Sequence, residues 1–334
     1  MTSTATATAT ATDALRVGVS ACLLGRAVRF DGQHKRDAFL VDRLGPFVEF
    51  VAVCPEVEVG MPIPRESLRL IRDGVPTAAG QTRLVAPRSG TDWTARMLVY
   101  ARRRVRDLAQ ENLSGYVLKK DSPSCGLTRV KAYPDAGADA RPERDGQGLF
   151  AAELRHAFPH LPIEEEGRLN DPALRENFIE RIFAYHRLRA LLAGRFTQRA
   201  LIAFHTGHKM ALLAHDDAEY RRLGRLVAIG KTLPRAELRE RYEAGFMAAL
   251  AKLATPGRHA NVLTHMLGHF SDRLQPDARQ ELLTVIEDHR RGLVPLMVPL
   301  TLIRHYVRLL GVEYLAGQTY LDPHPKELML RNRV

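Results

Sequence analysis

The sequence predicts two domains, an α/β domain with a mostly parallel, Rossmann-like sheet followed by an all-α domain. Three observations lead to this fold class. First, strand-like and helix-like segments alternate up to residue 165, whereas helical periodicity with few strand signals continues from there to residue 315. Second, all three cysteines precede residue 166, while ten of the thirteen histidines follow it. Third, 334 residues exceed what one ordinary hydrophobic core organises.

The first domain, residues 15–165, contains three strand-like runs. Their alternating or densely β-branched side chains predict strands at residues 15–20, 47–53 and 115–119. Apolar residues at helical spacing predict helices at residues 37–44, 91–112 and 149–156. Gly, Pro and charged residues predict loops at residues 60–64 and 135–148. Because a helix returns the chain between strands, neighbouring strands are expected to pair in parallel.

The second domain, residues 166–334, has the pattern of packed helices. Asp171 and Pro172 form the capping signal of its first helix. Periodic apolar positions then predict helices at residues 172–193, 197–204, 207–228, 234–254, 258–272, 276–291 and 298–315. The sequence has no uncharged apolar run of about eighteen residues, so no transmembrane helix is expected.

Cysteine content and the first residues indicate a cytoplasmic protein. Three cysteines are an odd number and lie too far apart for a disulfide framework. Residues 1–14 consist largely of alternating Thr and Ala, without the basic and Leu-rich segments of a secretory signal. Because such low-complexity sequence has little to bury, we expect a disordered tail there.

The positive charge of the chain is concentrated in the second domain. Residues 1–166 hold 23 Lys and Arg against 21 Asp and Glu, whereas residues 167–334 hold 26 against 17, out of a formal net charge of +11. This excess makes RNA contact a hypothesis, because basic side chains bind phosphates and aromatic rings stack on bases. A solvated charged surface explains the same pattern. The residues considered for RNA contact are Arg221, Arg222, Arg225, Arg290, Arg291, Arg304, Tyr220 and Tyr242.

Cys22, Cys54 and Cys125 share one position in the predicted fold. Each follows the carboxyl end of a predicted strand, the edge at which parallel sheets bind ligands. Thiolates are soft ligands, so three of them suit a zinc ion completed by histidine or an iron–sulfur cluster with one open iron. Small buried thiols without a metal are the alternative. Small residues, Pro or Gly flank every cysteine, which favours a metal site.

The sequences around the cysteines resemble those of the TudS-type thiouracil desulfidases. The matching motifs are VSACLLG at residues 19–25, VCPE with a following GxPxPR at 53–65, and KxxSPSCG at 119–126. The resemblance covers residues 15 to 160 approximately. Later residues resemble the YbgA-type domain that is often fused behind a TudS domain, through FHTGHK at 204–209, LGRLV at 223–227 and PLTLI at 299–303.

This resemblance implies a non-redox desulfidase with a [4Fe-4S] cluster. Cys22, Cys54 and Cys125 would ligate three irons, leaving the fourth iron open to the substrate sulfur. An open iron acts as a Lewis acid on the C=S bond, so that water attacks the ring carbon. The products are the oxo base and hydrogen sulfide. The implied substrates are thiouracil and 4-thiouridine monophosphate, the latter released by tRNA turnover.

The same motifs supply candidates for catalysis and substrate binding. Glu56 is the first choice for general acid and base, with Ser122 second and Ser124 third. The alternatives are a carboxylate that only accepts loop amides and serines that only cap a turn. The residues beside the cysteine loops that are assigned to substrate or phosphate binding are Arg26, Arg65, Lys120 and Ser20.

Histidines of the second domain give only a weak indication of a metal. His205, His208 and His215 lack a common metal-binding spacing. His265 and His269 lie four residues apart on one helical face, which suits a metal and a buried polar pair equally. The alternative to an enzyme is therefore a zinc- or RNA-binding adaptor in which the cysteines are structural.

Overall fold

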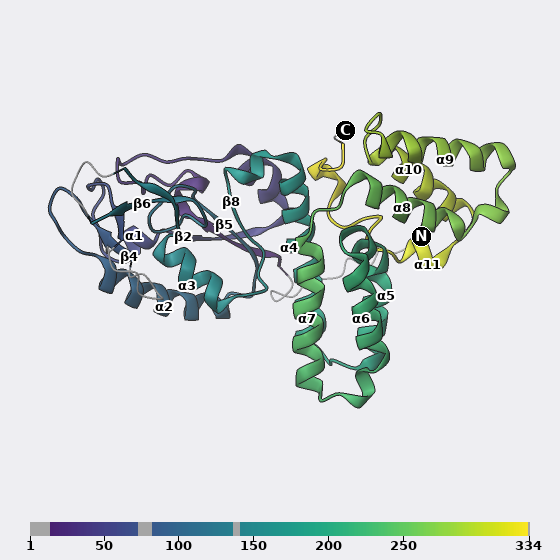
Figure 1. Ribbon diagram of the computed structural model, residues 1–334, viewed down its shortest axis with the longest axis horizontal. Coiled ribbons are helices and arrows are strands. Elements are labelled where there is room, and N and C mark those ends of the chain that lie inside the picture. The colour runs from purple at the N-terminus through teal and green to yellow at the C-terminus, as the bar shows by residue number, and fades with distance from the viewer. Residues whose placement is uncertain (1–13, 73–81, 136–140, 333–334) are drawn as a thin grey trace, which may run out of the picture. The chain divides into compact units, whose positions relative to one another are not determined.

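The computed structural model describes residues 14–72, 82–135 and 141–332 (Figure 1). The chain divides into two compact units, Met1–Gly167 and Arg168–Val334. The first is α/β and the second is helical, so the predicted fold class is confirmed. The predicted disordered tail falls almost wholly on residues 1–13, which lie outside the described residues.

A four-stranded parallel sheet forms the centre of the first unit. Its strands, in the order β2-β1-β5-β8, are Glu49–Val53, Arg16–Ser20, Leu113–Leu118 and Ile163–Glu165. Ser20 pairs with Val53, and Val19 pairs with Val117, so the carboxyl ends of β1, β2 and β5 lie side by side. All six residues of β5 are buried, as expected for a strand inside a parallel sheet.

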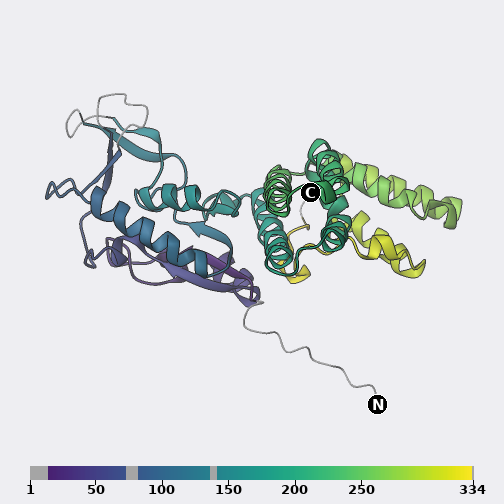
Figure 2. The same ribbon diagram turned by 90° about the horizontal axis from the view of Figure 1, so that it is seen from below.

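Two helices, α2 (Thr94–Gln110) and α3 (Leu149–Ala157), lie together on one side of this sheet (Figure 2). Met97, Ala101, Val105 and Leu108 of α2 repeat every three or four residues and are buried, which is the apolar face of an amphipathic helix. The helix expected at residues 37–44 is a π-helical turn, Phe39–Leu44.

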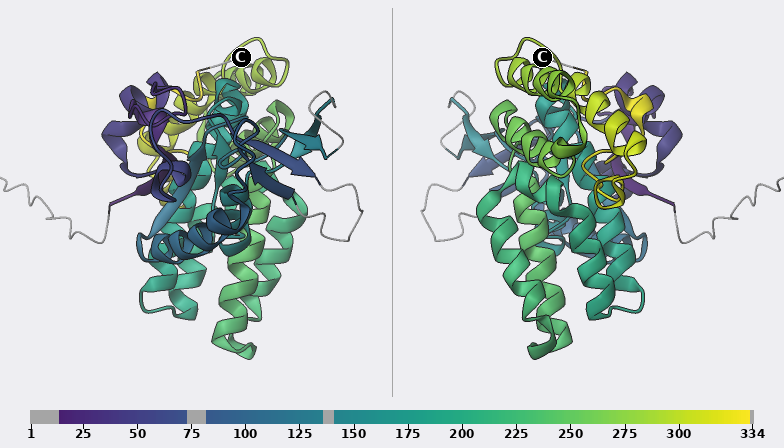
Figure 3. Two further views of the ribbon diagram at one scale, coloured as in Figure 1. Left: turned by 90° about the vertical axis from the view of Figure 1, so that its left-hand side faces the viewer. Right: turned by 90° about the vertical axis from the view of Figure 1, so that its right-hand side faces the viewer.

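A second, mixed sheet was not predicted. Its strands, in the order β4-β3-β6-β7, are Thr82–Val85, Arg69–Arg72, Val130–Pro134 and Glu143–Gly146, and they lie side by side in blue and teal in Figure 3 (left). The prediction of a loop at residues 135–148 was therefore wrong for β7. This strand has no apolar pattern, but the Arg72 guanidinium bonds to Glu143 and Asp145, each at 2.9 Å, across the sheet. Such cross-strand pairs stabilise an exposed edge strand.

Eight helices make up the described part of the second unit. They are α4 (Pro172–Ala193), α5 (Gln198–His215), α6 (Asp217–Ala228), α7 (Arg235–Ala251), α8 (Pro256–Gly268), α9 (Pro276–Arg290), α10 (Met297–Leu309) and α11 (Glu313–Ala316). Helices α4 to α7 pack as a bundle, which Figure 2 shows nearly end-on, and α8 to α10 pack against one another beside it. None of the described helices is long and apolar enough to cross a membrane.

Two predicted helix boundaries were wrong. Helix α5 continues through the expected break at residues 205–206 and ends at His215. The next residue, Asp216, caps α6, because its carboxylate accepts from the Glu219 amide at 3.4 Å. The helix expected at 298–315 is two helices, because Gly311 takes a left-handed conformation with φ of +62° between α10 and α11.

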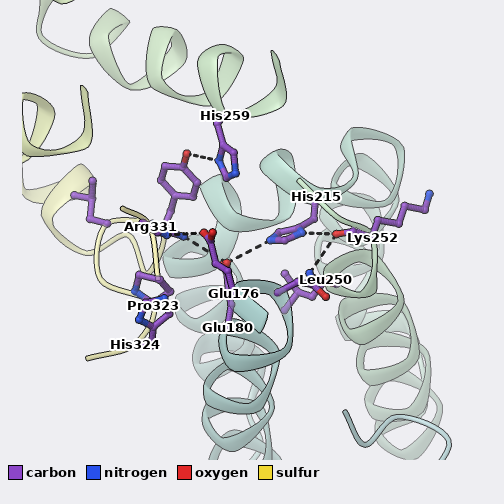
Figure 4. A network of polar contacts seen from close by, with 12 residues as sticks. Glu176, Glu180, His215, Leu250, Lys252, His259, Pro323, His324 and Arg331 are labelled. Atoms are coloured by element: carbon purple, nitrogen blue, oxygen red, sulfur yellow. Dashed lines mark hydrogen bonds and ion pairs between the residues drawn. The ribbon is translucent and has the colours of Figure 1, made fainter. Parts of the chain in front are cut away.

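A buried ionic network joins the C-terminal residues of the second unit to α4 (Figure 4). Arg331 bonds to Glu176 at 3.2 Å and lies 3.4 Å from Glu180. His215 lies between the Glu180 carboxylate, at 3.5 Å, and the Lys252 carbonyl, at 2.5 Å. Burial alone lowers the pKa of His215, but these two acceptors outweigh it and raise that pKa. The network therefore favours the imidazolium form of His215 and holds the Arg331 guanidinium against two carboxylates.

Acid is expected to destabilise the helical unit. Burial lowers the pKa of His205 to about 4, of His208 to about 3 and of His324 to about 4, from about 6.5 in an unfolded chain. The folded state keeps these rings neutral. The stability that they contribute is therefore complete above about pH 6.5 and falls as the pH drops from about 6.5 towards 4. The pKa of His215 is raised, so this residue stabilises the folded state at lower pH, but it is one group against three.

The measurement is the melting temperature of the helical signal, followed by circular dichroism between about pH 7.5 and pH 5. We expect a fall of about 10 °C over this range. Replacing His208 by leucine removes one titrating ring and should make the curve flatter. A melting temperature that does not depend on pH would contradict this assignment of neutral histidines.

Candidate active site

The three cysteines line one cavity of about 360 Å³ at the carboxyl edge of the parallel sheet. Cys22 lies in the 3-10 turn that follows β1, and Cys54 follows β2 as the residue that precedes α1 (Pro55–Glu58). Cys125 lies in the loop that follows β5. The parallel strand order thus brings together residues that are 32 and 71 positions apart in the sequence.

Hydrogen bonds fix the backbone of each cysteine loop. The Cys22 carbonyl accepts from the Lys35 amide at 2.9 Å. The Cys54 amide donates to Glu58 Oε1 at 3.0 Å, and the other oxygen of Glu58 accepts from the Tyr100 hydroxyl at 2.7 Å. Because Tyr100 belongs to α2, the helix beneath the sheet holds the position of Cys54.

The Cys125 loop is the most tightly constrained of the three. The Ser122 hydroxyl accepts from the amides of Ser124, at 3.3 Å, and Cys125, at 3.1 Å. Gly148 packs against this loop so closely that a Cβ there would lie 2.5 Å from the Ser124 carbonyl oxygen. Glu165, at the end of β8, accepts from the Leu127 amide at 2.7 Å. These contacts therefore hold the backbone of the Cys125 loop in place on both sides of Cys125.

The thiols are protonated in the absence of a cation, because their environment opposes ionisation. Burial and the neighbouring Cys54 raise the pKa of the Cys22 thiol to about 11. Burial likewise raises the pKa of Cys54 and, together with Glu56 and Cys54, that of Cys125. Three thiolates in this cavity thus require a multivalent positive group to offset their mutual repulsion.

The three thiols form a donor set that an iron–sulfur cluster can use. Among the described residues, no three His, Cys, Asp or Glu side chains lie close enough together to hold one metal ion. Tetrahedral zinc needs ligands that converge on one point. A cubane takes each thiolate at a separate iron, which suits Cys22, Cys54 and Cys125 standing around the wall of a cavity.

Glu56 lies on the same cavity wall, held by two polar side chains. Its Oε2 accepts from Arg65 Nε at 2.9 Å and from Nη2 at 2.6 Å, and its Oε1 accepts from the Ser124 hydroxyl at 3.0 Å. Arg65 also donates to the carbonyls of Val28, at 3.0 Å, and Pro62, at 3.3 Å. The guanidinium thereby ties the Cys22 loop to the segment that follows Cys54.

The three predicted serines occupy different places. Ser20 and Ser122 line the cavity, whereas Ser124 is fully buried and lies behind Glu56. The Ser20 hydroxyl accepts from the Lys119 amide at 2.9 Å. Ser122 caps the Cys125 turn, which is the alternative considered for it from the sequence. Ser124 contacts Glu56 directly, a pairing that sequence spacing does not reveal.

The predicted phosphate-binding residues also differ in their places relative to the cavity. Lys120 is exposed and lines the cavity, whereas Arg26 is exposed and is absent from its lining. The guanidinium of Arg65 is occupied by Glu56 and two carbonyls, an arrangement that favours orienting Glu56 over binding phosphate. Lys35 lines the cavity and was missed, although its place in the loop after Cys22 was a usable signal. Phe30 was missed as well.

Variants of Arg65 distinguish an orienting role from phosphate binding. We expect Arg65→Gln to lower kcat about tenfold with little change in KM, because the Glu56 carboxylate loses its bidentate partner. Arg65→Lys keeps one charged donor and should restore part of the loss. Steady-state kinetics on the substrates that the sequence resemblance implies, a thiolated nucleotide and its free base, test this. A KM that rises for the nucleotide alone would assign Arg65 to phosphate instead.

In the second unit, the histidines have separate protein partners. His205 Nδ1 contacts the Tyr242 hydroxyl at 3.2 Å, and His208 Nδ1 contacts the Phe204 carbonyl at 2.7 Å. His215 belongs to the network of Figure 4. These rings do not meet at one point, and each has a structural role. His265 and His269 meet edge to face, with ring centres 5.3 Å apart.

The residues considered for RNA contact are mostly engaged elsewhere. Tyr242 is fully buried, so it has no free face for a base. Ion pairs join five of the six arginines to carboxylates of the same unit, namely Arg221–Asp217, Arg222–Glu219, Arg290–Glu287, Arg291–Glu287 and Arg304–Asp322. Exposed ion pairs of this kind are weak, so RNA contact by this surface stays a prediction.

Comparisons with known proteins agree with the two units. Residues 17–166 match the family model described as 2-thiouracil desulfurase, and residues 209–325 match the one described as a protein of unknown function, DUF1722. The uncharacterized protein YbgA of Escherichia coli K12 is 37% identical over 153 residues, which are 46% of this chain and 90% of that protein. The uncharacterized protein YbbK of Bacillus subtilis 168 is 29% identical over 153 residues, which are 46% of this chain and 97% of that protein.

One solved structure is also similar. It is described as the [4Fe-4S]-dependent thiouracil desulfidase TudS, with 30% sequence identity, a TM-score of 0.38, and coverage of 49% of this chain and 99% of that one. The two family-model matches confirm the resemblance found in the sequence at the level of the family. The chain therefore carries a domain of the 2-thiouracil desulfurase family at residues 17–166, joined to a C-terminal DUF1722 region at residues 209–325.

Proposed function

We propose that this protein removes sulfur from thiolated pyrimidines at a [4Fe-4S] cluster held by Cys22, Cys54 and Cys125. The observation that carries the proposal is the meeting of three thiols from three separate loops on one cavity wall, in a chain of the thiouracil desulfurase family. Their raised pKa values support it further, because they describe a site that needs a multivalent cation before its thiols ionise.

The reaction replaces a ring C=S by C=O. When bound, the cluster supplies an open, thiophilic iron that acts as a Lewis acid on the C=S group. The oxygen of one water molecule enters the ring carbon, and its two protons leave with the sulfur as hydrogen sulfide. No electron is gained or lost by the protein, so no external reductant enters the balance.

Glu56 is the group that moves the protons in this proposal. Its carboxylate lies on the cavity wall, with each oxygen held by a fixed donor. Arg65 and Ser124 keep the carboxylate from rotating, so the lone pairs that remain keep one direction in the cavity. Glu56 accepts a proton from the attacking water and returns one to the departing sulfur. Ser122 and Ser20 contribute hydroxyls to the wall beside it.

The cations of the cavity favour a nucleotide, 4-thiouridine monophosphate, over a free base. Lys35 and Lys120 both line the cavity and are exposed, and within the described ranges neither has an ion-pair partner. Arg29, beside them, lies 3.4 Å from Asp31. These two exposed ammonium groups on the cavity wall supply donors for a phosphate. In the cytoplasm, such a nucleotide would come from the turnover of thiolated tRNA.

The test is turnover by anaerobically purified protein of 4-thiouridine monophosphate, 4-thiouridine and 2-thiouracil. Loss of the thiocarbonyl absorption and release of sulfide are measured together, and we expect equal amounts of oxo product and sulfide. Replacing both Lys35 and Lys120 by alanine should raise KM about tenfold for the nucleotide and leave KM for the free base unchanged. Absence of sulfide with all three compounds would overturn the proposed function.

A further inference from the structure

An exposed aromatic ring stands on the wall of the thiol cavity. Phe30 is 41% exposed and lines the cavity together with Cys22 and Cys54. Large apolar side chains are usually buried, because each Å² of apolar surface in water costs about 25 cal/mol. An exposed phenylalanine in a cavity lined with charged residues is thus an apolar surface to which a ligand can bind.

The backbone beneath this ring is fixed. Residues 29–33 form a tight turn, in which the Gly32 amide donates to the Arg29 carbonyl at 3.0 Å and the Arg29 amide donates to the Gln33 carbonyl at 3.1 Å. Gly32 has a φ of +71°, a left-handed conformation that glycine adopts without strain. The Phe30 carbonyl accepts from the Arg65 amide at 2.8 Å. The ring is therefore presented from a rigid support.

A cation polarises the ring from one side. The guanidinium of Arg29 lies over Phe30 at 5.3 Å from the ring centre, and Asp31 holds Arg29 by an ion pair at 3.4 Å. A ring whose one face is covered by a cation has its other surface left for a second planar group. Pyrimidines are planar, and they stack on aromatic side chains whatever their substituents.

We propose that Phe30 is the stacking surface for the pyrimidine ring of the substrate. This inference rests on the proposed function and adds the group that recognises the base, whereas Lys35 and Lys120 were assigned to the phosphate. It gives the cavity a preference for planar heteroaromatic thiones. Open-chain thioamides carry the same C=S group without a ring, so they gain nothing from Phe30.

Variants of Phe30 and Ile63 test the proposal. In Phe30→Ala we expect kcat/KM for 2-thiouracil to fall about tenfold or more, mainly through KM, whereas Phe30→Tyr keeps the ring and should stay within about threefold of wild type. Ile63 is the matched control. It is also 41% exposed and lies beside the same turn, 4.0 Å from a Cβ built on Gly32, but is absent from the cavity lining. Ile63→Ala should leave KM unchanged.

Equilibrium dialysis with labelled uracil, the oxo product, gives a readout that needs no turnover. Phe30→Ala should weaken uracil binding by the same factor by which it raises KM, and Phe30→Tyr should not. Unchanged binding and KM in Phe30→Ala, with an active wild-type protein, would overturn the stacking role alone. Wild-type protein that releases no sulfide would instead overturn the proposed function itself, so the two failures are distinguishable.

Discussion

Replacing Arg331 by methionine is expected to destabilise the protein by about 3–5 kcal/mol in its free energy of unfolding. Arg331 is 3% exposed, pairs with Glu176 and Glu180, and donates to the Tyr320 carbonyl at 2.6 Å. Methionine fills similar volume but leaves two buried carboxylates without their guanidinium. Urea unfolding followed by circular dichroism measures the loss.

Two further variants control this experiment. Arg221→Met removes a 67% exposed side chain that pairs with Asp217 one turn away, and it should change stability by less than about 0.5 kcal/mol. Combining Arg331→Met with Glu176→Gln removes one of the buried charges and should recover part of the loss. If Arg331→Met alone stays within about 1 kcal/mol of wild type, the network does not anchor the C-terminal residues to α4.

Replacing Glu56 by glutamine is expected to lower kcat by a factor of about 100 or more, without loss of the cluster. Glutamine is nearly isosteric and its amide oxygen still accepts from Arg65, but it cannot take a proton from water. The measurement is kcat for sulfide release, with the iron content of each preparation determined in parallel. Glu49→Gln, which lies 60% exposed at the opposite end of β2, is the control and should behave as wild type.

Comparison with the Arg65 variants shows whether Glu56 transfers protons or only anchors Arg65. If Glu56 only anchored Arg65, Glu56→Gln and Arg65→Gln would lower kcat equally. If Glu56 carries the protons, Glu56→Gln has the larger effect, because it removes the proton carrier rather than the group that orients it. A Glu56→Gln protein that keeps more than about one third of wild-type kcat would remove Glu56 from the proton transfers.

Regular elements were predictable where local signals are strong. Helix α4 begins and ends where the Asp171 cap, the Pro172 start and the apolar periodicity place it, at Pro172 and Ala193. The parallel sheet followed from three apolar runs separated by helices. In contrast, β7 forms through its backbone pairing with β6, and its charged side chains contact Arg72, more than 70 positions away, so no local pattern reports it.

The gathering of the three cysteines was predictable, but the contacts around them were not. Each cysteine follows a strand, so the strand order alone brings Cys22, Cys54 and Cys125 to one edge. The partners of Glu56 could not be predicted, because Arg65 reaches it from an irregular loop whose course depends on bonds to Val28 and Phe30. The same tertiary bonds present Phe30 to the cavity, where a sequence pattern would place an ordinary core aromatic.

The content of iron, zinc and acid-labile sulfide in anaerobically purified protein tests the central claim most directly. A cluster held by Cys22, Cys54 and Cys125 predicts a brown protein with about four irons and four sulfides per chain. A colourless protein that carries stoichiometric zinc and no labile sulfide would contradict the claim and make the cysteines structural.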